Sequence, residues 1–351
     1  MNIIKICITL CISINVATAL ATPPTLSQKY LNLKSNFSYL NTTANFDPQG
    51  GEIVDLSKNG YYRNYLLNFS AFYTFQSDAA IDLGFSFTSA ESFDGTDERT
   101  NTEFTDVQGK ILYQLFDKSF EIITEAAINI PFNRFDANTD DVLTGEGTMS
   151  VSGGLWLVKD FGSFYIYLSG FYLYRDEGRS HLLPWSLGTE FDFNGFYVGA
   201  EGYGFESVTD DEETSTPTNK TTITNRVNAG SLTYYAVNPQ EIAAKVWFGI
   251  DFSKYFRTNL VYSQGLNGTN YGLNQIIAVS LEYKLDMSIN EPKQRSYYER
   301  KKRRQLKSFE VDDESYDEDL FDTNKQMQRR KQKKKDEKLL NETEKSLESE
   351  L

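Results

Sequence analysis

Apolar and aromatic residues recur at every second position in segment after segment of this chain. The most regular early example is the run Tyr65, Leu67, Phe69, Ala71, Tyr73 and Phe75. The residues between these positions are mostly polar, and the same period returns in separate segments to about residue 285. Successive side chains of a strand point to opposite faces, so each segment has one apolar face and one more polar face. The pattern predicts a chain built almost entirely of β-strands.

The first residues have the features of a secretory signal peptide. Lys5 precedes an apolar stretch, and Ala19-Leu20-Ala21 is a small-x-small cleavage site. The apolar stretch is short for a membrane-spanning helix, which argues against an uncleaved anchor. We therefore expect residues 1–21 to be removed. Both cysteines, Cys7 and Cys11, lie in this segment, so the mature chain would have no thiol and no disulfide.

About twelve strands are predicted between residues 30 and 285. They cover residues 30–40, 61–76, 81–88, 106–115, 121–130, 148–159, 164–175, 185–193, 196–201, 242–252, 256–263 and 274–285. Short turns, of which Asn194-Gly195 is the strongest signal, alternate with longer loops at about 93–102, 133–146 and 208–238. The last loop contains a strand-like stretch, residues 231–237. It would either add a hairpin, giving fourteen strands, or cross the mouth of a barrel.

An antiparallel up-and-down transmembrane β-barrel over residues 22–285 fits these features best. After residue 21 no segment has the uncharged length that a spanning helix needs, and the chain contains 22 Tyr, 25 Phe and 23 Gly residues. A soluble β-sandwich also shows alternation. The export signal, the short-turn and long-loop asymmetry and the outward aromatic residues favour the barrel. The expected location is the outer membrane of a Gram-negative bacterium.

The charge is distributed unevenly along the chain. Residues 22–285 contain 17 basic and 32 acidic residues, whereas residues 286–351 contain 17 of each. The acidic body argues against nucleic-acid binding. Residues 286–351 are expected to form a charged periplasmic tail, disordered or partly helical. Its basic run could contact the inner-leaflet surface or a periplasmic protein partner through Arg300, Lys301, Lys302, Arg303 and Arg304.

Charged residues recur on the predicted inward faces of the strands. Those expected to line the lumen are Asp82, Asp106, Lys110, Glu121, Glu125, Glu190, Asp192, Glu201, Lys245, Asp251, Arg257 and Glu282. They could surround a water-filled passage for cations or dipolar solutes. They could equally pair with one another and fill a closed interior.

The only histidine, His181, lies in a connection between two strands. Some twelve-stranded barrels are phospholipases that use a His–Ser pair, but Ser180 beside His181 is not expected to face it productively. We predict no catalytic residue, no cofactor and no metal site, and no enzyme activity.

Several segments carry a family resemblance. Residues 278–285, Ala-Val-Ser-Leu-Glu-Tyr-Lys-Leu, resemble the terminal strand of bacterial outer-membrane β-barrel proteins, although here 66 residues follow it. Residues 259–268 and 270–275 resemble the penultimate hairpin of the long-chain fatty-acid and phenol-pathway outer-membrane transporters, and residues 61–64 are similar to an early segment of the same group. The resemblance implies uptake of small, hydrophobic solutes.

The sequence thus predicts a porin-like channel or passive transporter for small solutes, with membrane lipid and the solute as its partners. The alternative is a structural or partner-anchoring barrel with a closed lumen, whose tail makes the interaction.

Overall fold

The computed structural model of the chain describes residues 23–24, 26, 30–48, 52–134, 138 and 140–287. The expected signal peptide, and all but the first two residues of the expected tail, lie outside these ranges. The prediction for Arg300 to Arg304 therefore concerns residues that are not described. Among the described residues, no helix is both long and apolar enough to cross a bilayer.

The described chain is mostly β-strand. The strands are β1 (Tyr30–Phe46), β2 (Ile53–Asp55), β3 (Tyr61–Thr74), β4 (Ala79–Phe93), β5 (Glu98–Asp117), β6 (Glu121–Pro131), β7 (Ser150–Asp160), β8 (Phe164–Arg175), β9 (Leu182–Asp192), β10 (Phe196–Ser207), β11 (Gln240–Ser253), β12 (Phe256–Thr269) and β13 (Tyr271–Asp286). The helices are the 3-10 turns η2 (Ser57–Asn59) and η3 (Glu212–Ser215) and the α-helix α1 (Thr218–Val227).

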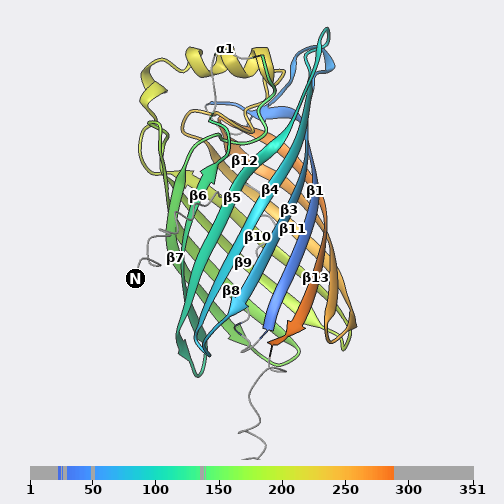
Figure 1. The fold of residues 1–351 in the computed structure, drawn as a ribbon. Coiled ribbons are helices and arrows are strands. Elements are labelled where there is room, and N and C mark those ends of the chain that lie inside the picture. Colours follow the sequence, from blue (N-terminus) through green and yellow to red (C-terminus); the bar gives the residue numbers. More distant parts are fainter. Residues whose placement is uncertain are drawn as a thin grey trace, which may run out of the picture. The chain divides into compact units, whose positions relative to one another are not determined.

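The twelve long strands close into a barrel, as Figure 1 shows. Consecutive long strands pair antiparallel, and β13 pairs with β1 from Tyr30 opposite Asp286 to Phe46 opposite Tyr271. The short strand β2 pairs only with the end of β1. Closure satisfies the backbone hydrogen bonds of every long strand within the sheet, as a membrane-spanning sheet requires. The predicted twelve-stranded barrel is confirmed.

The two ends of the barrel differ. At one end, which we call the turn end, neighbouring strands are joined by short connections such as that at Asn194-Gly195. Both of these residues have positive φ, 57° and 117°, as a two-residue hairpin turn favours. At the other end, the loop end, most connections are longer, although Asn270 alone joins β12 to β13, and α1 lies there (Figure 1). The first and last strands, β1 and β13, respectively begin and end at the turn end.

Two loop-end segments differ from the prediction. The hairpin of β4 and β5 extends to Phe93 and Glu98, so residues 98–102, expected in a loop, are in a strand. Backbone pairing continues there although the side chains are polar. In residues 208–238 the hairpin, one of the two alternatives that the sequence allowed, is absent, since this segment contains η3 and α1 and no strand. A positive φ at Tyr235 interrupts extended structure within the strand-like stretch, and Ala229 and Gly230 just before it also have positive φ.

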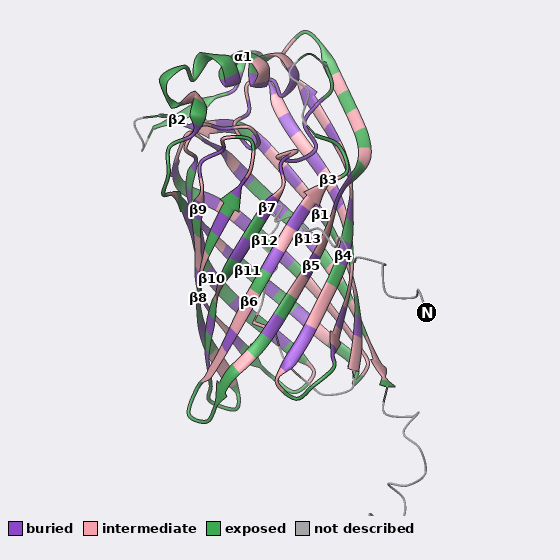
Figure 2. Ribbon diagram, turned by 60° about the vertical axis from the view of Figure 1, so that its left-hand side comes forward, coloured by how far each residue is buried: buried purple, intermediate pink, exposed green. Residues whose placement is uncertain are grey.

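The outer surface of the barrel is apolar. Figure 2 shows buried and exposed residues alternating along the strands. On β8, for example, Ile166, Leu168 and Tyr172 are exposed, whereas Tyr167 is buried. The exposed large hydrophobic residues extend over every long strand except β6, far more than a soluble monomer leaves in contact with water. Lipid chains are the solvent that this surface requires.

Candidate functional site in the barrel lumen and its cap

Charged side chains of neighbouring strands pair inside the barrel. Lys245 of β11 lies 2.9 Å from Glu201 of β10, and both side chains are almost fully buried. The hydroxyl of Tyr167 on β8 also donates to Glu201. A charge removed from water at this depth needs a partner of opposite sign, and the register of β10 and β11 places these two residues directly opposite each other.

A second group of charges lies nearer the turn end. Glu190 of β9 accepts a hydrogen bond from Arg257 of β12 at 3.0 Å and one from Trp247 of β11 at 2.7 Å. Arg257 also lies 3.4 Å from Asp251 and stacks on the ring of Tyr197. Because β9 and β12 are not adjacent in the sheet, the Arg257–Glu190 contact crosses part of the lumen.

A third pair joins β5 and β6. Lys110 lies 3.5 Å from Glu125, which also accepts a hydrogen bond from the indole of Trp156 at 3.0 Å. Glu121, nearer the turn end, accepts a hydrogen bond from Gln114 at 3.2 Å. The charges of Lys110 and Glu125 thus neutralise each other, whereas the partner of Glu121 is a neutral amide.

The remaining predicted lumen residues lie in different surroundings. Asp106 is buried and Asp82 is half-buried. Glu282 lies 3.9 Å from Lys284, close to the turn end of β13. Asp192 is exposed and accepts a hydrogen bond from the backbone of Asn194, so it supports a turn.

Two clusters of buried hydrophobic residues also occupy the interior. One includes Phe72, Leu112, Trp156 and Trp247, from strands on several sides of the barrel. The other lies at the loop end and includes Tyr62 with residues of both long loops. Aromatic side chains are large enough to fill much of the width of a twelve-stranded barrel. The lumen of this structure is therefore narrow and mixed in character.

Two loops cover the loop end, and we call them together the cap. The first cap loop joins β6 to β7, and its described residues are 132–134, 138 and 140–149; the second, residues 208–239, joins β10 to β11. The backbone carbonyl of Leu143 in the first loop accepts a hydrogen bond from Tyr62 at 2.6 Å. That of Thr144 accepts one from Asn64 at 3.2 Å. The first loop is thus bound to inward-facing residues of β3.

The second cap loop is hydrogen-bonded to β1 and β13, the first and last strands of the barrel. The hydroxyl of Thr233 lies 3.0 Å from that of Thr42 on β1 and donates to Asn274 of β13 at 2.8 Å. Asn45 of β1 donates to the carbonyl of Gly230 at 2.8 Å. Residues 231–237 therefore lie against the inner wall of the mouth, which is one of the two arrangements that the sequence left open.

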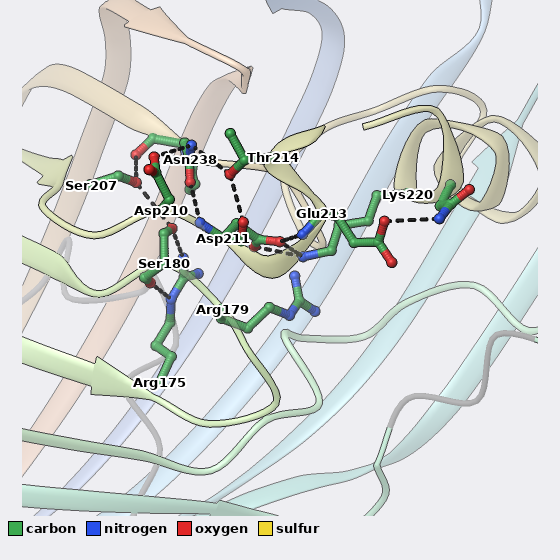
Figure 3. A network of polar contacts seen from close by, with 12 residues as sticks. Arg175, Arg179, Ser180, Ser207, Asp210, Asp211, Glu213, Thr214, Lys220 and Asn238 are labelled. Carbon is green, nitrogen blue, oxygen red and sulfur yellow. Dashed lines mark hydrogen bonds and ion pairs between the residues drawn. The ribbon is translucent and has the colours of Figure 1, made fainter. Parts of the chain in front are cut away.

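A buried group of charges connects the two cap loops to the end of β8. We call it the cap charge cluster; it consists of Glu146, Arg175, Arg179, Asp211 and Lys220, and Figure 3 labels the last four of these. Lys220 on α1 lies 2.6 Å from Asp211. Glu146 lies 3.6 Å from Arg175 and 3.5 Å from Arg179. Figure 3 shows the Arg179 side chain extending toward Asp211 and Lys220. The cluster holds three positive and two negative side chains.

Burial also changes the acidity of the lysine in this cluster. Loss of solvation lowers the pKa of Lys220 to about 8, and the nearby positive charge of Arg179 acts in the same direction. The hydrogen bonds and charge of Asp211 oppose this change without cancelling it. The Lys220 ammonium is therefore held in the cap against a desolvation penalty.

A cavity of about 110 Å³ lies inside the barrel beneath the cap. Its wall includes Phe171, Leu173, Phe205 and Tyr271, and also Trp156 and Tyr203. Charged residues at its border are Lys110, Glu125, Glu146, Arg175 and Glu201. The cavity thus touches two of the lumen ion pairs and part of the cap charge cluster. A small molecule could reside in it.

Sequence reasoning missed the cap contacts. Thr42 and Thr233 are 191 residues apart, and no local pattern signals their contact. Little in the sequence indicated that Arg175 and Arg179 belong to a site. They lie at and just after the end of a strand, where charged side chains are usually exposed, yet both are buried.

The histidine and its neighbour have separate partners. His181 Nδ1 lies 2.5 Å from the Tyr172 hydroxyl, whereas Ser180 accepts from Arg175 at 2.8 Å and contacts Ser207 at 3.1 Å. The described residues include no group of three or more His, Cys, Asp and Glu side chains that could hold a metal ion.

No protein-family model matches the chain, and no curated protein matches it either. Among solved structures, an outer membrane channel from Pseudomonas putida F1 is similar, with a TM-score of 0.61 and 10% identity over 76% of this chain and 100% of that one.

Two further structures are more distant. The NanC porin has a TM-score of 0.42 and 9% identity over 73% of this chain and 100% of its own. The translocator domain of the autotransporter NalP from Neisseria meningitidis has a TM-score of 0.41 and 10% identity over 77% and 92%. Neither is close enough to carry an argument. The likeness to the Pseudomonas structure is one of fold, and together with the apolar exterior it shows a transmembrane β-barrel with the fold of that outer membrane channel.

Proposed function

We propose that the protein is an outer-membrane channel for small solutes in a Gram-negative bacterium. The observation that carries the proposal is the cavity of about 110 Å³ that is lined by the barrel wall and by Glu146 and Pro239 of the cap. A barrel that serves only as an anchor needs no space of this kind, since side chains fill the interior of small barrels. The fold, which is that of a known outer membrane channel, agrees with this function.

The cap would then be the gate. It consists of loops attached to the inner wall by hydrogen bonds such as those of Tyr62, Asn64 and Thr42. Loops held by a limited set of polar contacts open at lower free energy than paired strands. Passage would require the cap loops to separate from β1, β3 and β13 while the barrel remains closed. A solute would then meet the mixed aromatic and charged lining of the cavity.

A disulfide across the mouth tests this proposal. The Thr42 and Thr233 hydroxyls are 3.0 Å apart, so the double variant T42C/T233C should form a bond that fixes the second cap loop to β1. We expect the wild-type barrel to conduct ions in planar bilayers. The oxidised double variant should retain at most about a tenth of that current, and reduction should restore it. T42C alone is the matched control.

The alternative function is a structural or partner-anchoring barrel with a closed lumen. The ion pairs of Lys245 with Glu201 and of Arg257 with Glu190 favour it, because they occupy the interior. A wild-type protein that carries no current at any potential, and admits no small sugar or amino acid into liposomes, would contradict the channel and support the anchor.

A further inference from the structure

In the cap charge cluster, Asp211 and Lys220 have close partners of opposite charge, whereas Arg175 and Arg179 do not. Asp211 is fully engaged, with both carboxylate oxygens 2.6–2.7 Å from Lys220 and a further hydrogen bond from the backbone of Glu213. Glu146 is therefore the one carboxylate of the cluster available to Arg175 and Arg179. Both arginine side chains are nearly inaccessible to solvent, at 4% and 1% exposure.

The contact of Glu146 with this arginine pair is a poor one. A single carboxylate oxygen, Oε2, lies near both guanidinium groups, at 3.6 and 3.5 Å, and the Glu146 backbone carbonyl accepts a hydrogen bond from Arg179 at 3.3 Å. Good charge-assisted hydrogen bonds between nitrogen and a carboxylate are shorter, about 2.7–2.9 Å. Within the described residues, neither Glu146 Oε2 nor Arg179 Nη1 makes a hydrogen bond. Two buried guanidinium groups thus share one loosely held carboxylate.

Of the two arginines, Arg175 lines the cavity. Arg175 and Glu146 lie at its border, and its adjacent wall is formed by Phe171, Leu173, Phe205 and Tyr271. The cavity volume of about 110 Å³ is of the order of one small ring, since an engineered apolar cavity of about 150 Å³ binds benzene. A ligand with a carboxylate at one end and a compact apolar body would match both the charge and the walls.

We propose that this cavity is a binding site for a small organic monocarboxylate, and that Glu146 occupies the ligand's place at Arg175 and Arg179 when the site is empty. The proposal names a substrate class for the channel and in that respect rests on the proposed function. The ligand carboxylate would form the short bidentate contact with Arg175 that Glu146 does not form. Glu146 belongs to the first cap loop, so its release would remove one attachment of the cap.

Binding of benzoate to the purified, folded barrel in detergent tests the proposal. Trp156 lines the cavity, so its fluorescence, checked by calorimetry, reports occupancy. The variant E146Q removes the competing charge and keeps the size of the side chain. We expect E146Q to bind benzoate at least tenfold more tightly than the wild type. The matched control E177Q, at a carboxylate paired with Arg134 outside the cavity, should leave the affinity unchanged.

Two further probes separate charge from shape. Benzyl alcohol has the same ring without the carboxylate, and its binding should be equal in wild type and E146Q. Inorganic phosphate has the charge without the ring, and it should bind more weakly than benzoate. R175Q, with folding verified by its heat-modifiable mobility on gels, should lose the preference for benzoate over benzyl alcohol.

The proposal is overturned if E146Q leaves the benzoate affinity unchanged, or if benzoate binds no better than benzyl alcohol or phosphate. These outcomes are independent of conduction. A barrel that conducts but shows no effect of E146Q refutes the site alone, whereas one that binds benzoate but never conducts refutes the channel alone.

Discussion

Lys245 and Glu201 show what a single inward charge contributes to this barrel. Each is almost completely enclosed, and each is the other's nearest opposite charge. A buried pair of this kind adds little net stability compared with apolar residues of the same size, because desolvation offsets the attraction. Loss of one partner is different, since it leaves a charge with neither water nor a counterion. The effect of an inward charge on the stability of this barrel therefore depends on whether its partner of opposite sign is present.

We expect K245M to lower the free energy of unfolding by about 3–5 kcal/mol, since it leaves Glu201 as an uncompensated buried carboxylate. The double variant K245M/E201Q should recover most of the loss. Urea unfolding in lipid vesicles, followed by tryptophan fluorescence, measures both. K284M is the control, because Lys284 is partly exposed and 3.9 Å from Glu282, and its loss should cost less than about 1 kcal/mol. Equal losses for K245M and K284M would contradict the argument.

At the scale of elements, the observed strands agree closely with those predicted from the sequence, whereas the structure of the cap was not predicted. The aromatic and β-branched alternation of β6, β8 and β13 marks their bounds to within a few residues. That signal fails where a strand leaves the membrane, as in β5, whose first residues are polar because water surrounds them. It also fails for α1, where Thr and Asn are poor helix formers and tertiary contacts decide the conformation. The cap charge cluster is equally hidden, because its members come from three separate segments.

The helix α1 should respond to pH through Lys220. Its pKa is about 8 in the docked cap and its ordinary value is 10.5, so between these values the undocked cap binds more protons. Docking should therefore strengthen as the pH rises from about 8 to 10, by at most about tenfold per pH unit, and be insensitive to this group below pH 8. A nitroxide label at T222C, on the exposed side of α1, measures the immobilised fraction.

K220M carries no titrating group at this position and is the control for the pH experiment. Its labelled helix should show the same immobilised fraction from pH 8 to pH 10. A wild-type fraction that falls as the pH rises would show that the ion pair with Asp211 outweighs the burial of the ammonium.

At the scale of the whole molecule, the closed barrel could be predicted from the sequence, but the side-chain contacts inside the barrel could not. A period of two repeated twelve times, with one face apolar, has few solutions for an exported chain besides a barrel. Which inward side chains meet across the lumen depends on the shear of the sheet and on loops that return into the mouth. The contact of Glu190 with Arg257 joins residues 67 apart, and no local rule supplies it.

The lipid-facing surface gives a prediction about the whole barrel. Leu168 is exposed and lies midway along β8 between Phe164 and Tyr172. We expect L168R to reduce the free energy of unfolding in phospholipid vesicles by about 2–4 kcal/mol, because it places a charge near the middle of the bilayer. V208R, at an exposed residue beyond the end of β10, should change it by less than about 0.5 kcal/mol. Indistinguishable effects of the two arginines would argue against a membrane around this wall.

The pairing of Tyr30 with Asp286 has a consequence for biogenesis. The seam between the first and last strands can form only after residue 286 has been synthesised. Until then the growing sheet carries two unsatisfied edges, each able to recruit strands from other molecules. An intermediate of this kind requires a chaperone or an insertion machine to shield it. A polypeptide truncated before β13 should consequently accumulate as aggregate or be degraded rather than persist as a smaller pore.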